Sequence, residues 1–341
     1  MIRVGLCMSG NTAMSEILRS ATIAESASWD SIWLGEDYFY RGGVTMAAAV
    51  ASVTSRLRIG LGIMTPLPRH PALTAMEVGT LQELSGGRIM AGVGAGVGGW
   101  MRQMGFEYGS PLTVMREGLE LTRRLLAGET VDYEGKVFSL HRVHLGFSAP
   151  VPPLLLGAVG PKALQLSGEI ADGTVLSVLA APSYVGWARE QINEGQHRSG
   201  RGHAEHLVVA YAFLAFADSI EAGRDLVRPL VAEYLAAGGV TALTQHLGLA
   251  EDFVHELRQA QARGEVVTER IADATLDAVA AAGPPDHCAR WVQTLASAGA
   301  DVVALIPLPT DQASAVVARA SAELLPLLNG STTHTDQKFS A

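Results

Sequence analysis

Apolar residues recur along the chain in two patterns, short continuous runs and helical repeats, and the two patterns alternate. Residues 57–63 and 88–93 are short apolar runs rich in glycine and β-branched side chains, which is typical of strands buried on both faces. Between them, Pro71–Leu84 carries apolar residues at helical spacing and ends at a Ser-Gly-Gly stop. This stretch therefore predicts a strand, a crossover helix and a second, parallel strand.

The same alternation continues over most of the chain. Strands are predicted at residues 2–8, 31–35, 57–63, 88–93, 153–156, 174–178, 207–216 and 301–306. Helices are predicted over about 17 residues capped by Asn11-Thr12, and at residues 44–53, 71–84, 112–126, 161–170, 182–199, 285–298 and 313–328. Eight strands alternating with helices predict an α/β fold, a (β/α)8 TIM barrel; a doubly wound sheet with a helical domain is the alternative.

Three segments depart from this alternation. Residues 130–140 have Glu134-Gly135 at their middle and predict a hairpin. Residues 218–283 are acidic, alanine-rich and helical, with no convincing strand. We therefore expect one barrel domain over residues 1–328, with insertions at about 97–150 and 218–282, the second of them helical and placed before the last strand. A polar tail at 329–341 is expected to be mobile.

Composition restricts the class of protein. The 341 residues are 48% hydrophobic and 17% charged, so the chain can bury a large core. The net charge of −9 and the lack of a basic run make nucleic acid and anionic membrane unexpected partners. Cys7 and Cys288 form no CxxC pair, which fits a reducing compartment. The chain starts on a strand rather than a signal peptide, and no apolar run could span a bilayer, so we expect a cytoplasmic protein that acts on a small molecule.

Glycines mark the ends of the two central strands. Glycine lets a flat ligand lie directly against the backbone, so we expect these strand ends to form the floor of a cofactor site. The run of residues 92–99 also matches GxGxxG from Gly94. A dinucleotide fingerprint would need a helix opening there and an acid at the end of the next strand. Residues 100–109 look irregular, so a glycine-lined pocket is favoured over a dinucleotide site or plain packing glycines.

A second glycine loop follows the strand predicted at 153–156. It runs from Gly157 to Gly160, with Pro161 at the expected first helical position and Lys162 beside it. Backbone N–H groups at such a helix start face anions, and a lysine adds positive charge. Phosphate binding is favoured, with an ordinary strand-to-helix loop as the alternative.

Ionisable residues offer few catalytic candidates. Glu36 and Asp37 follow the second predicted strand, and one of them could carry a proton or cap the next helix. His70 opens a helix, where packing or hydrogen bonding is favoured over catalysis. The other histidines have no metal-ligand spacing, so no metal site is expected. A GxSxG nucleophile motif is absent, which weakens a hydrolase interpretation.

Several segments together carry a family resemblance. They are WLGEDY at 33–38, GLGIMTPLPRHP at 60–71, LQELSGGRIMAGVGAG at 81–96, LLAGETVDYE at 126–134 and GAVGPKALQLSGEIADG at 157–173. With the late region 283–307, they make the chain resemble the bacterial-luciferase-like flavin and deazaflavin oxidoreductases. The resemblance is nearest to the branch that uses deazaflavin coenzyme F420 and includes methylenetetrahydromethanopterin reductase. It is poorest over residues 218–282.

The resemblance implies a cofactor ring lying across the C-terminal mouth of the barrel, backed by a non-proline cis peptide that falls on Gly62-Ile63. The cofactor-binding residues it implies are Gly62, Ile63, Met64, Gly94, Ala95, Gly96, Gly157, Ala158, Gly160 and Pro161. The family often carries Asp-His where this chain has Glu36-Asp37, so either acid is a candidate proton carrier here. Cys7-Met8 replaces the first-strand acid of the reductase, which argues against the methanopterin substrate itself.

The resemblance leads us to expect an oxidoreductase that transfers a hydride between coenzyme F420 and a small organic substrate. A monooxygenase that uses reduced FMN and oxygen is the alternative. A catalytically silent barrel that only binds a partner is a third possibility. Substrate choice is expected to depend on the loops after the first, fourth and seventh strands and on residues 218–282. A homodimer is expected, as is common in the family.

Overall fold

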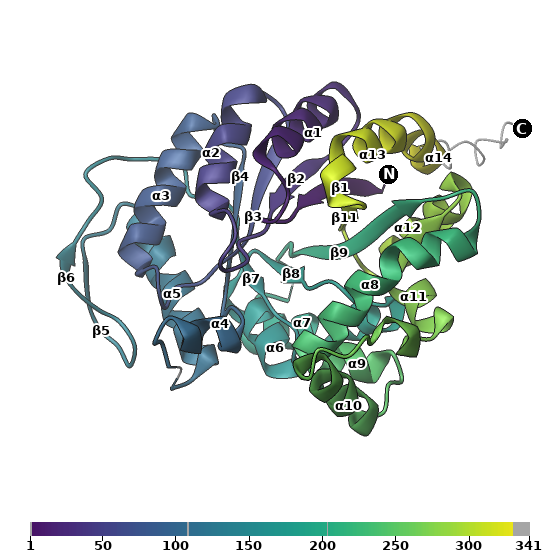
Figure 1. The fold of residues 1–341 in the computed structure, drawn as a ribbon. Helices are drawn as coiled ribbons and strands as arrows, with labels where there is room; N and C mark the ends of the chain where they lie inside the picture. Colours follow the sequence, from purple (N-terminus) through teal and green to yellow (C-terminus); the bar gives the residue numbers. More distant parts are fainter. Residues whose placement is uncertain (1, 108, 203, 330–341) are drawn as a thin grey trace, which may run out of the picture.

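The computed structural model describes residues 2–107, 109–202 and 204–329. Within them, eight parallel strands close into a barrel (Figure 1). The strands are β1 (Arg3–Met8), β2 (Ser31–Leu34), β3 (Arg58–Met64), β4 (Ile89–Gly94), β7 (Leu154–Gly157), β8 (Gly173–Leu176), β9 (Leu207–Phe216) and β11 (Val302–Pro307). Each pairs with the next in this order, and β11 pairs with β1 to close the ring. The predicted (β/α)8 barrel is confirmed.

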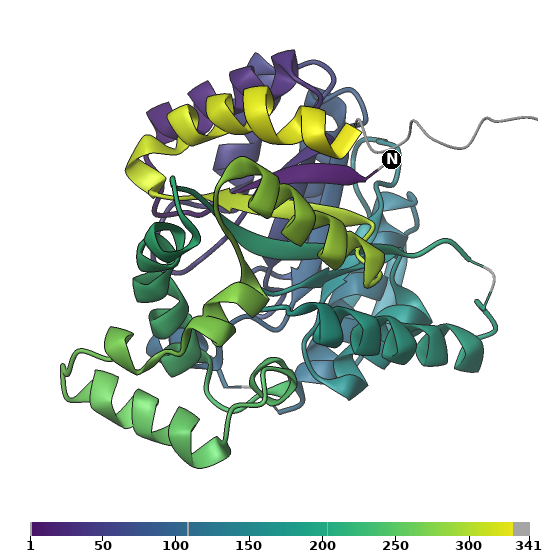
Figure 2. The same ribbon diagram turned by 90° about the vertical axis from the view of Figure 1, so that its right-hand side faces the viewer.

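Helices surround the barrel (Figures 1 and 2). They are α1 (Met14–Ser26), α2 (Gly43–Val53), α3 (Pro71–Leu84), α5 (Pro111–Leu126), α6 (Pro161–Ile170), α7 (Pro182–Arg198), α12 (Pro285–Ser297) and α13 (Ala313–Arg319). A π-helical turn at Ala320–Leu324 joins α13 to α14 (Leu325–Asn329). The predicted Asn11-Thr12 cap is wrong, because α1 begins after Ala13 with no side-chain cap. The tail predicted to be mobile lies, from residue 330, outside the described residues.

The first excursion contains a hairpin and a short helix. The hairpin of β5 (Val131–Glu134) and β6 (Ser139–Val143) agrees with the prediction at 130–140. The short helix α4 (Gly98–Gln103) lies partly in a segment expected to be irregular. That expectation was wrong because a helix of six residues that begins with two glycines leaves little periodic signal.

The second excursion is mainly helical and covers one side of the barrel, at the lower right of Figure 1. Its helices are α8 (Ile220–Gly238), α9 (Ala242–His246), α10 (Glu251–Ala262) and α11 (Asp273–Val279), with a 3-10 turn at Thr268–Arg270. It ends in a strand, β10 (Ala280–Gly283), where none was expected. The pairing of β8 along β9 stops at Ala210, and β10 pairs from Phe213 onward, so β10 extends the sheet beyond the end of β8.

The barrel has two cores. Outward-facing strand residues pack against the helices, whereas inward-facing residues fill the barrel itself. The interior is dominated by Trp33, Tyr211 and Phe213, which are all buried. The Trp33 ring occupies the space beside Gly60, where an added Cβ would lie 2.1 Å from the ring. A glycine on β3 is therefore required by the tryptophan on β2.

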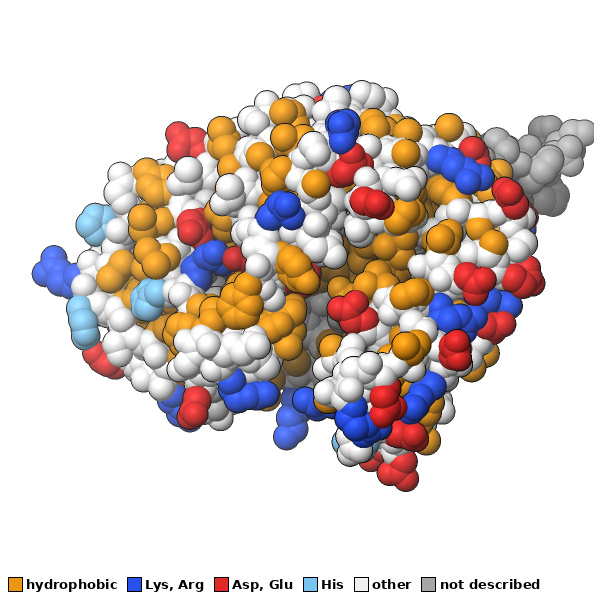
Figure 3. Space-filling view, in the orientation of Figure 1, with side chains coloured by type: hydrophobic (Ala, Val, Ile, Leu, Met, Phe, Trp, Pro, Cys, Tyr) orange, Lys and Arg blue, Asp and Glu red, His pale blue; other side chains and the backbone are white. Residues whose placement is uncertain are grey.

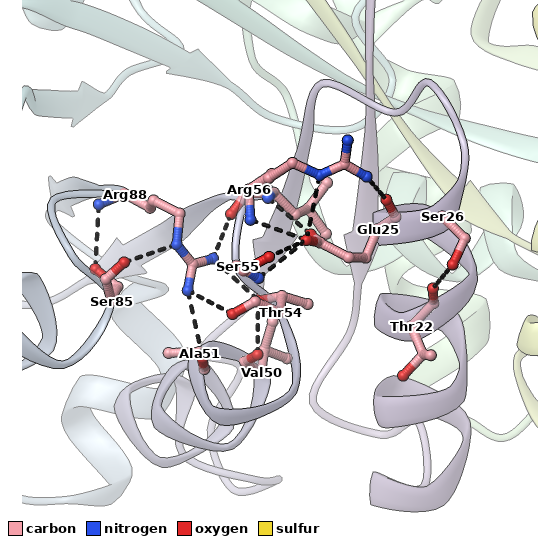
Figure 4. Close-up of polar contacts among 11 residues, drawn as sticks. Thr22, Glu25, Ser26, Val50, Ala51, Thr54, Ser55, Arg56, Ser85 and Arg88 are labelled. Carbon is pink, nitrogen blue, oxygen red and sulfur yellow. Dashed lines mark hydrogen bonds and ion pairs between the residues drawn. The ribbon is translucent and has the colours of Figure 1, made fainter.

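A polar network ties the loops at the N-terminal ends of the strands together (Figure 4). Arg88 donates to the backbone carbonyls of Leu57, Thr54 and Ser85. The Glu25 carboxylate accepts backbone N–H bonds from Leu57, Ser55 and Arg56 at 2.9–3.0 Å. Burial raises the pKa of Glu25, but these hydrogen bonds outweigh burial and lower it to about 2. These contacts hold neighbouring loops together at this end of the barrel, and their polar groups are used for structure.

Candidate functional site

The C-terminal ends of the strands, here called the mouth, lie toward the viewer near the centre of Figure 1, where the loops after β1 and β2 run. The surface in the same orientation is hollowed near its centre, and hydrophobic side chains gather around the hollow (Figure 3). Barrel enzymes use this end because loops from many strands converge on it. None of the described helices is long and apolar enough to cross a membrane.

The Ile63 side chain lies at the mouth, where strands β4 and β7 end in glycine. The Gly62-Ile63 peptide is cis, as predicted, and the register between β3 and β4 shifts at this point. The Ile63 side chain lies against the ends of β4 and β7, where a Cβ added to Gly94 or Gly157 would come within 2.6 and 3.0 Å of it. Glycine at these two strand ends therefore makes room for a half-buried isoleucine.

The expectation that a flat ligand lies directly against bare backbone at these strands needs correction. A Cβ on Gly62 would lie 1.7 Å from the Tyr211 hydroxyl oxygen, which reaches across the barrel from β9. Side chains of the opposite wall and Ile63 thus fill the space that the glycines leave. The floor of the mouth is the Ile63 side chain with its neighbouring backbone.

The other predicted cofactor residues of the strand ends differ in burial and in backbone conformation. The side chains of Met64 and Ala158 are buried in the core between barrel and helices, so only their backbone can face the mouth. Ala95 is half-buried against the same core. Gly96 has a φ of +72° and lies against Thr65, so a side chain there would be strained and crowded.

The loop after β7 has the predicted geometry of a helix start. Gly160 is the N-cap residue of α6, and Pro161 is its first residue. Tyr184 of α7 donates its hydroxyl to the Val159 carbonyl at 2.8 Å, which fixes the loop from behind. A Cβ added to Gly160 would meet no atom within 4 Å, so the surface of the loop is open at this residue.

The two adjacent carboxylates after β2 differ sharply in environment. Glu36 forms a bidentate ion pair with Arg69, at 2.8 and 2.9 Å, and its side chain is only 7% exposed. Arg69 also pairs with Glu77 of α3 at 2.8 Å. The Glu36 carboxylate therefore anchors the β2 loop to the start of α3.

Asp37 has no cationic partner among the described residues. Its carboxylate accepts one long hydrogen bond, from the Ser9 hydroxyl at 3.4 Å. Burial raises the pKa of Asp37, and the Ser9 hydrogen bond opposes the shift only in part. A carboxyl group with a raised pKa is suited to exchanging a proton.

His70 has the structural role that was favoured. Its Nδ1 accepts the backbone N–H of Ala72 at 3.2 Å, which caps α3, and its ring packs edge-on against Phe138. Burial lowers the pKa of His70, in keeping with a neutral ring that accepts at Nδ1. No cluster of three metal-ligating side chains occurs among the described residues.

Two features of the mouth were not found from the sequence. Tyr38 lies against Trp100 of α4, with ring centroids 6.1 Å apart, which gives the mouth an aromatic edge. The buried Tyr211 hydroxyl has no hydrogen-bond partner among the described residues. Burial raises the pKa of Tyr211, and nearby Cys7 and Asp37 raise it further. An orphaned hydroxyl at the base of the mouth is a polar group that a ligand or water can satisfy.

The closed barrel of parallel strands and helices, with the side chains of its mouth, is the architecture of a (β/α)8 barrel protein. The luciferase-like monooxygenase family model matches residues 2–302. The chain is 32% identical over 301 residues to 5,10-methylenetetrahydromethanopterin reductase of Archaeoglobus fulgidus, covering 86% of this chain and 90% of the relative. The chain belongs to the luciferase-like family, and is thereby an oxidoreductase; both predictions are confirmed.

Solved structures agree on the fold. The coenzyme F420-dependent tetrahydromethanopterin reductase of Methanopyrus kandleri superposes with a TM-score of 0.86 at 23% identity, covering 95% of this chain and 99% of that one. The oxygenating constituent of 3,6-diketocamphane monooxygenase of Pseudomonas putida, in complex with FMN, superposes with a TM-score of 0.69 at 19% identity, covering 95% and 98%. Both deazaflavin-dependent and FMN-dependent enzymes therefore share this barrel.

Proposed function

We propose that this protein transfers a hydride between coenzyme F420 and a small organic substrate at the mouth. The observation that carries the proposal is the floor of the mouth, where strands β4 and β7 end in glycine around the Ile63 side chain. This arrangement leaves a low apolar surface for a planar ring beside the half-buried carboxyl group of Asp37. The similarity to a methylenetetrahydromethanopterin reductase over most of both chains favours the deazaflavin as the ring.

The residues of the mouth fit such a group. Ile63 and the backbone of Gly62 would lie beneath the ring, and the orphaned Tyr211 hydroxyl would find a partner when the mouth is filled. The open Gly160 and the start of α6 would receive its phosphate. Gly94, Ala95, Gly96 and the rest of the predicted set remain proposed contacts. When bound, a reduced deazaflavin supplies the hydride, while the protein supplies orientation and a dry site.

Asp37 is the proposed proton carrier. The ion pair with Arg69 gives the Glu36 carboxylate a structural role. Asp37 is therefore favoured over Glu36 as the proton carrier. Its burial favours the protonated form at a higher pH than for a solvated aspartate. Ser9 would orient the carboxyl group, and Tyr38 with Trp100 would limit access of water from one edge.

A second candidate function is an FMN-dependent monooxygenase. The family description and the FMN-bound structural relative from Pseudomonas putida favour it. The two functions differ in whether oxygen is consumed. They share the barrel, so the cofactor decides between them.

A titration separates the two candidates. Oxidised F420 and FMN are added separately to the purified protein, and binding is followed by cofactor fluorescence and absorbance. We expect F420 to bind more tightly than FMN, and the reduced F420 complex to consume no oxygen. Oxygen uptake with reduced FMN alone would overturn the deazaflavin proposal. Failure of both cofactors to bind would overturn the proposal that a cofactor ring occupies the mouth.

We also propose that the protein forms a homodimer through α3. Leu73, Met76 and Leu84 are each about half exposed and recur at helical spacing along α3. Val53 at the end of the neighbouring α2 extends this apolar surface. Exposed apolar patches of this kind mark contacts between subunits. Light scattering during gel filtration should give twice the mass of the 35.9 kDa chain, and Met76→Glu should shift the mass toward the monomer.

A further inference from the structure

Exposed aromatic side chains border the mouth. Phe39 and Tyr40 lie in the segment between β2 and α2 and are 64% and 61% exposed, more than any other Phe, Tyr or Trp side chain of the described residues. Phe39 lies beside Tyr38, and Tyr38 lies beside Trp100 of α4, with ring centroids 6.1 Å apart in both pairs. These four side chains are here called the aromatic rim.

The backbone that carries the two exposed rings is held in place. The backbone N–H of Tyr40 donates to the Asp37 carbonyl at 2.9 Å. The Arg41 guanidinium donates to the carbonyls of Gly10 and Asn11 at 3.1 and 3.2 Å, so the loop after β1 supports the loop after β2. Apolar surface that stays uncovered on a well-held loop is typical of a ligand-binding surface.

The walls below the aromatic rim are also apolar. Val178 and Leu179, after β8, and Leu308, after β11, are buried in the cluster that fills the barrel. Tyr234 of α8 packs on the same cluster, with its ring centroid 5.7 Å from that of Phe213. Hydrophobic side chains gather around the hollow of the surface in Figure 3. The second excursion and the barrel therefore share one apolar surface at the mouth.

Few cations stand at the strand ends. The segments that join each barrel strand to the next helix contain two arginines, Arg41 and Arg69, and no lysine. Arg41 is bound by two backbone carbonyls, and Arg69 pairs with the carboxylates of Glu36 and Glu77. A phosphate or carboxylate on a substrate would therefore find no free cation in these segments, all of which the structure describes.

We infer that the substrate of the hydride transfer is an uncharged, largely apolar molecule that binds against the aromatic rim. The inference rests on the proposed function and adds the class of its substrate. Aromatic side chains suit such a molecule, because each offers a large apolar face. A charged group would have to leave water without a partner. Phe39 and Tyr40 are thereby residues that determine specificity.

The test compares two ketones that differ by one charge, acetophenone and 4-acetylbenzoate. The protein is first saturated with oxidised F420, which is followed by cofactor fluorescence, and binding of each ketone is then measured by calorimetry. We expect acetophenone to bind about tenfold more tightly than 4-acetylbenzoate, because the carboxylate loses water without gaining a partner. Binding of acetophenone should also show a negative change in heat capacity, which marks the burial of apolar surface.

Variants locate the effect on the aromatic rim. Phe39→Ala should weaken the binding of acetophenone about fivefold, as expected for the loss of one aromatic contact. Phe39→Leu keeps an apolar side chain and should restore part of the loss. Phe147→Ala is the matched control, because Phe147 is a partly exposed aromatic residue that lies beside Gly79 of α3, outside the mouth. It should leave the binding of acetophenone unchanged.

The outcomes separate the inference from the proposed function. No binding of acetophenone, equal binding of both ketones, or unchanged binding in Phe39→Ala would overturn the inference alone. Tighter binding of 4-acetylbenzoate would also overturn it and would point to an exposed cation such as Arg102 of α4. If F420 itself does not bind, the proposed function fails and the inference fails with it.

Discussion

The two sides of the barrel interior contain opposite kinds of residue. On β3, β4 and β7 the inward positions near the mouth are glycines, including Gly62, Gly94 and Gly157. On β2 and β9 they are large aromatics, Trp33 and Tyr211, whose ring centroids lie 6.2 Å apart. The glycine side of the interior is complementary to the aromatic side, because most inward glycines face an aromatic residue or Ile63 rather than empty space.

This contrast separates two uses of glycine that look alike in a sequence. Inside the barrel, Gly60 faces the Trp33 ring and Gly62 faces the Tyr211 hydroxyl group, so packing requires glycine at both positions. At the rim, Gly160 faces no atom within 4 Å, so packing does not require it. A glycine that packing does not explain is the better candidate for a ligand contact.

The largest effect is expected for Gly60→Ala. The added Cβ would lie 2.1 Å from the Trp33 ring, which is fully buried and cannot move aside. Overpacking of this severity should lower the free energy of unfolding by about 3 kcal/mol or more. Urea denaturation followed by tryptophan fluorescence measures it, and Trp33→Leu in the same chain should restore part of the loss. A Gly60→Ala protein as stable as the wild type would contradict the fit between the two sides.

Gly62→Ala should come next, and its cost should depend on Tyr211. The added Cβ would lie 1.7 Å from the Tyr211 hydroxyl oxygen but 3.0 Å from the ring carbon that bears it. Tyr211→Phe removes the oxygen, so the double variant should lose less stability than Gly62→Ala alone. Tyr211→Phe by itself should stabilise the empty protein by about 1 kcal/mol, because it removes a buried hydroxyl that has no partner. Additive losses in the cycle would show that the two residues do not interact.

The helices were predicted best where the chain carries explicit boundaries. Pro71–Leu84 and Pro161–Ile170 were predicted with both ends correct, because each begins with proline and the first ends at a Ser-Gly-Gly stop. β10 was missed because its sequence, three alanines and a glycine, has no strand preference of its own. β10 is a strand because it pairs with β9 in the folded protein, which its own sequence does not predict.

The site was predicted less completely, because its parts come together only in the fold. The Glu36–Arg69 pair joins residues 33 positions apart, and no spacing rule marks it. β9 is apolar on both faces, so its sequence does not tell that Tyr211 points inward. The choice between Glu36 and Asp37 therefore had to wait for the structure, as did the finding that side chains fill most glycine positions.

Asp37→Asn is expected to act on the reaction more than on the fold. If Asp37 carries the proton, kcat should fall about a hundredfold. Its pKa in the folded protein is raised, so stability is greatest below the pKa of a solvated aspartate and falls as the pH rises through the raised value. The variant lacks this loss and should gain stability relative to the wild type as the pH rises. Glu36→Gln is the control, since it should destabilise the β2 loop without shifting the pH profile of kcat.

Gly160→Ala is expected to have the smallest effect on stability. It tests most directly whether a glycine that packing does not require marks a ligand contact. Gly160 has φ −87° and ψ 162°, which any residue adopts, and its Cβ would touch nothing. The free energy of unfolding should therefore stay within about 0.5 kcal/mol of the wild type. A phosphate held against the Gly160 backbone would be displaced by the new methyl group, so the dissociation constant of F420 should rise. Gly146→Ala, at an equally open glycine outside the mouth, should change neither quantity. If Gly160→Ala also leaves the dissociation constant of F420 unchanged, the open surface at Gly160 is not a ligand contact. The phosphate must then bind elsewhere.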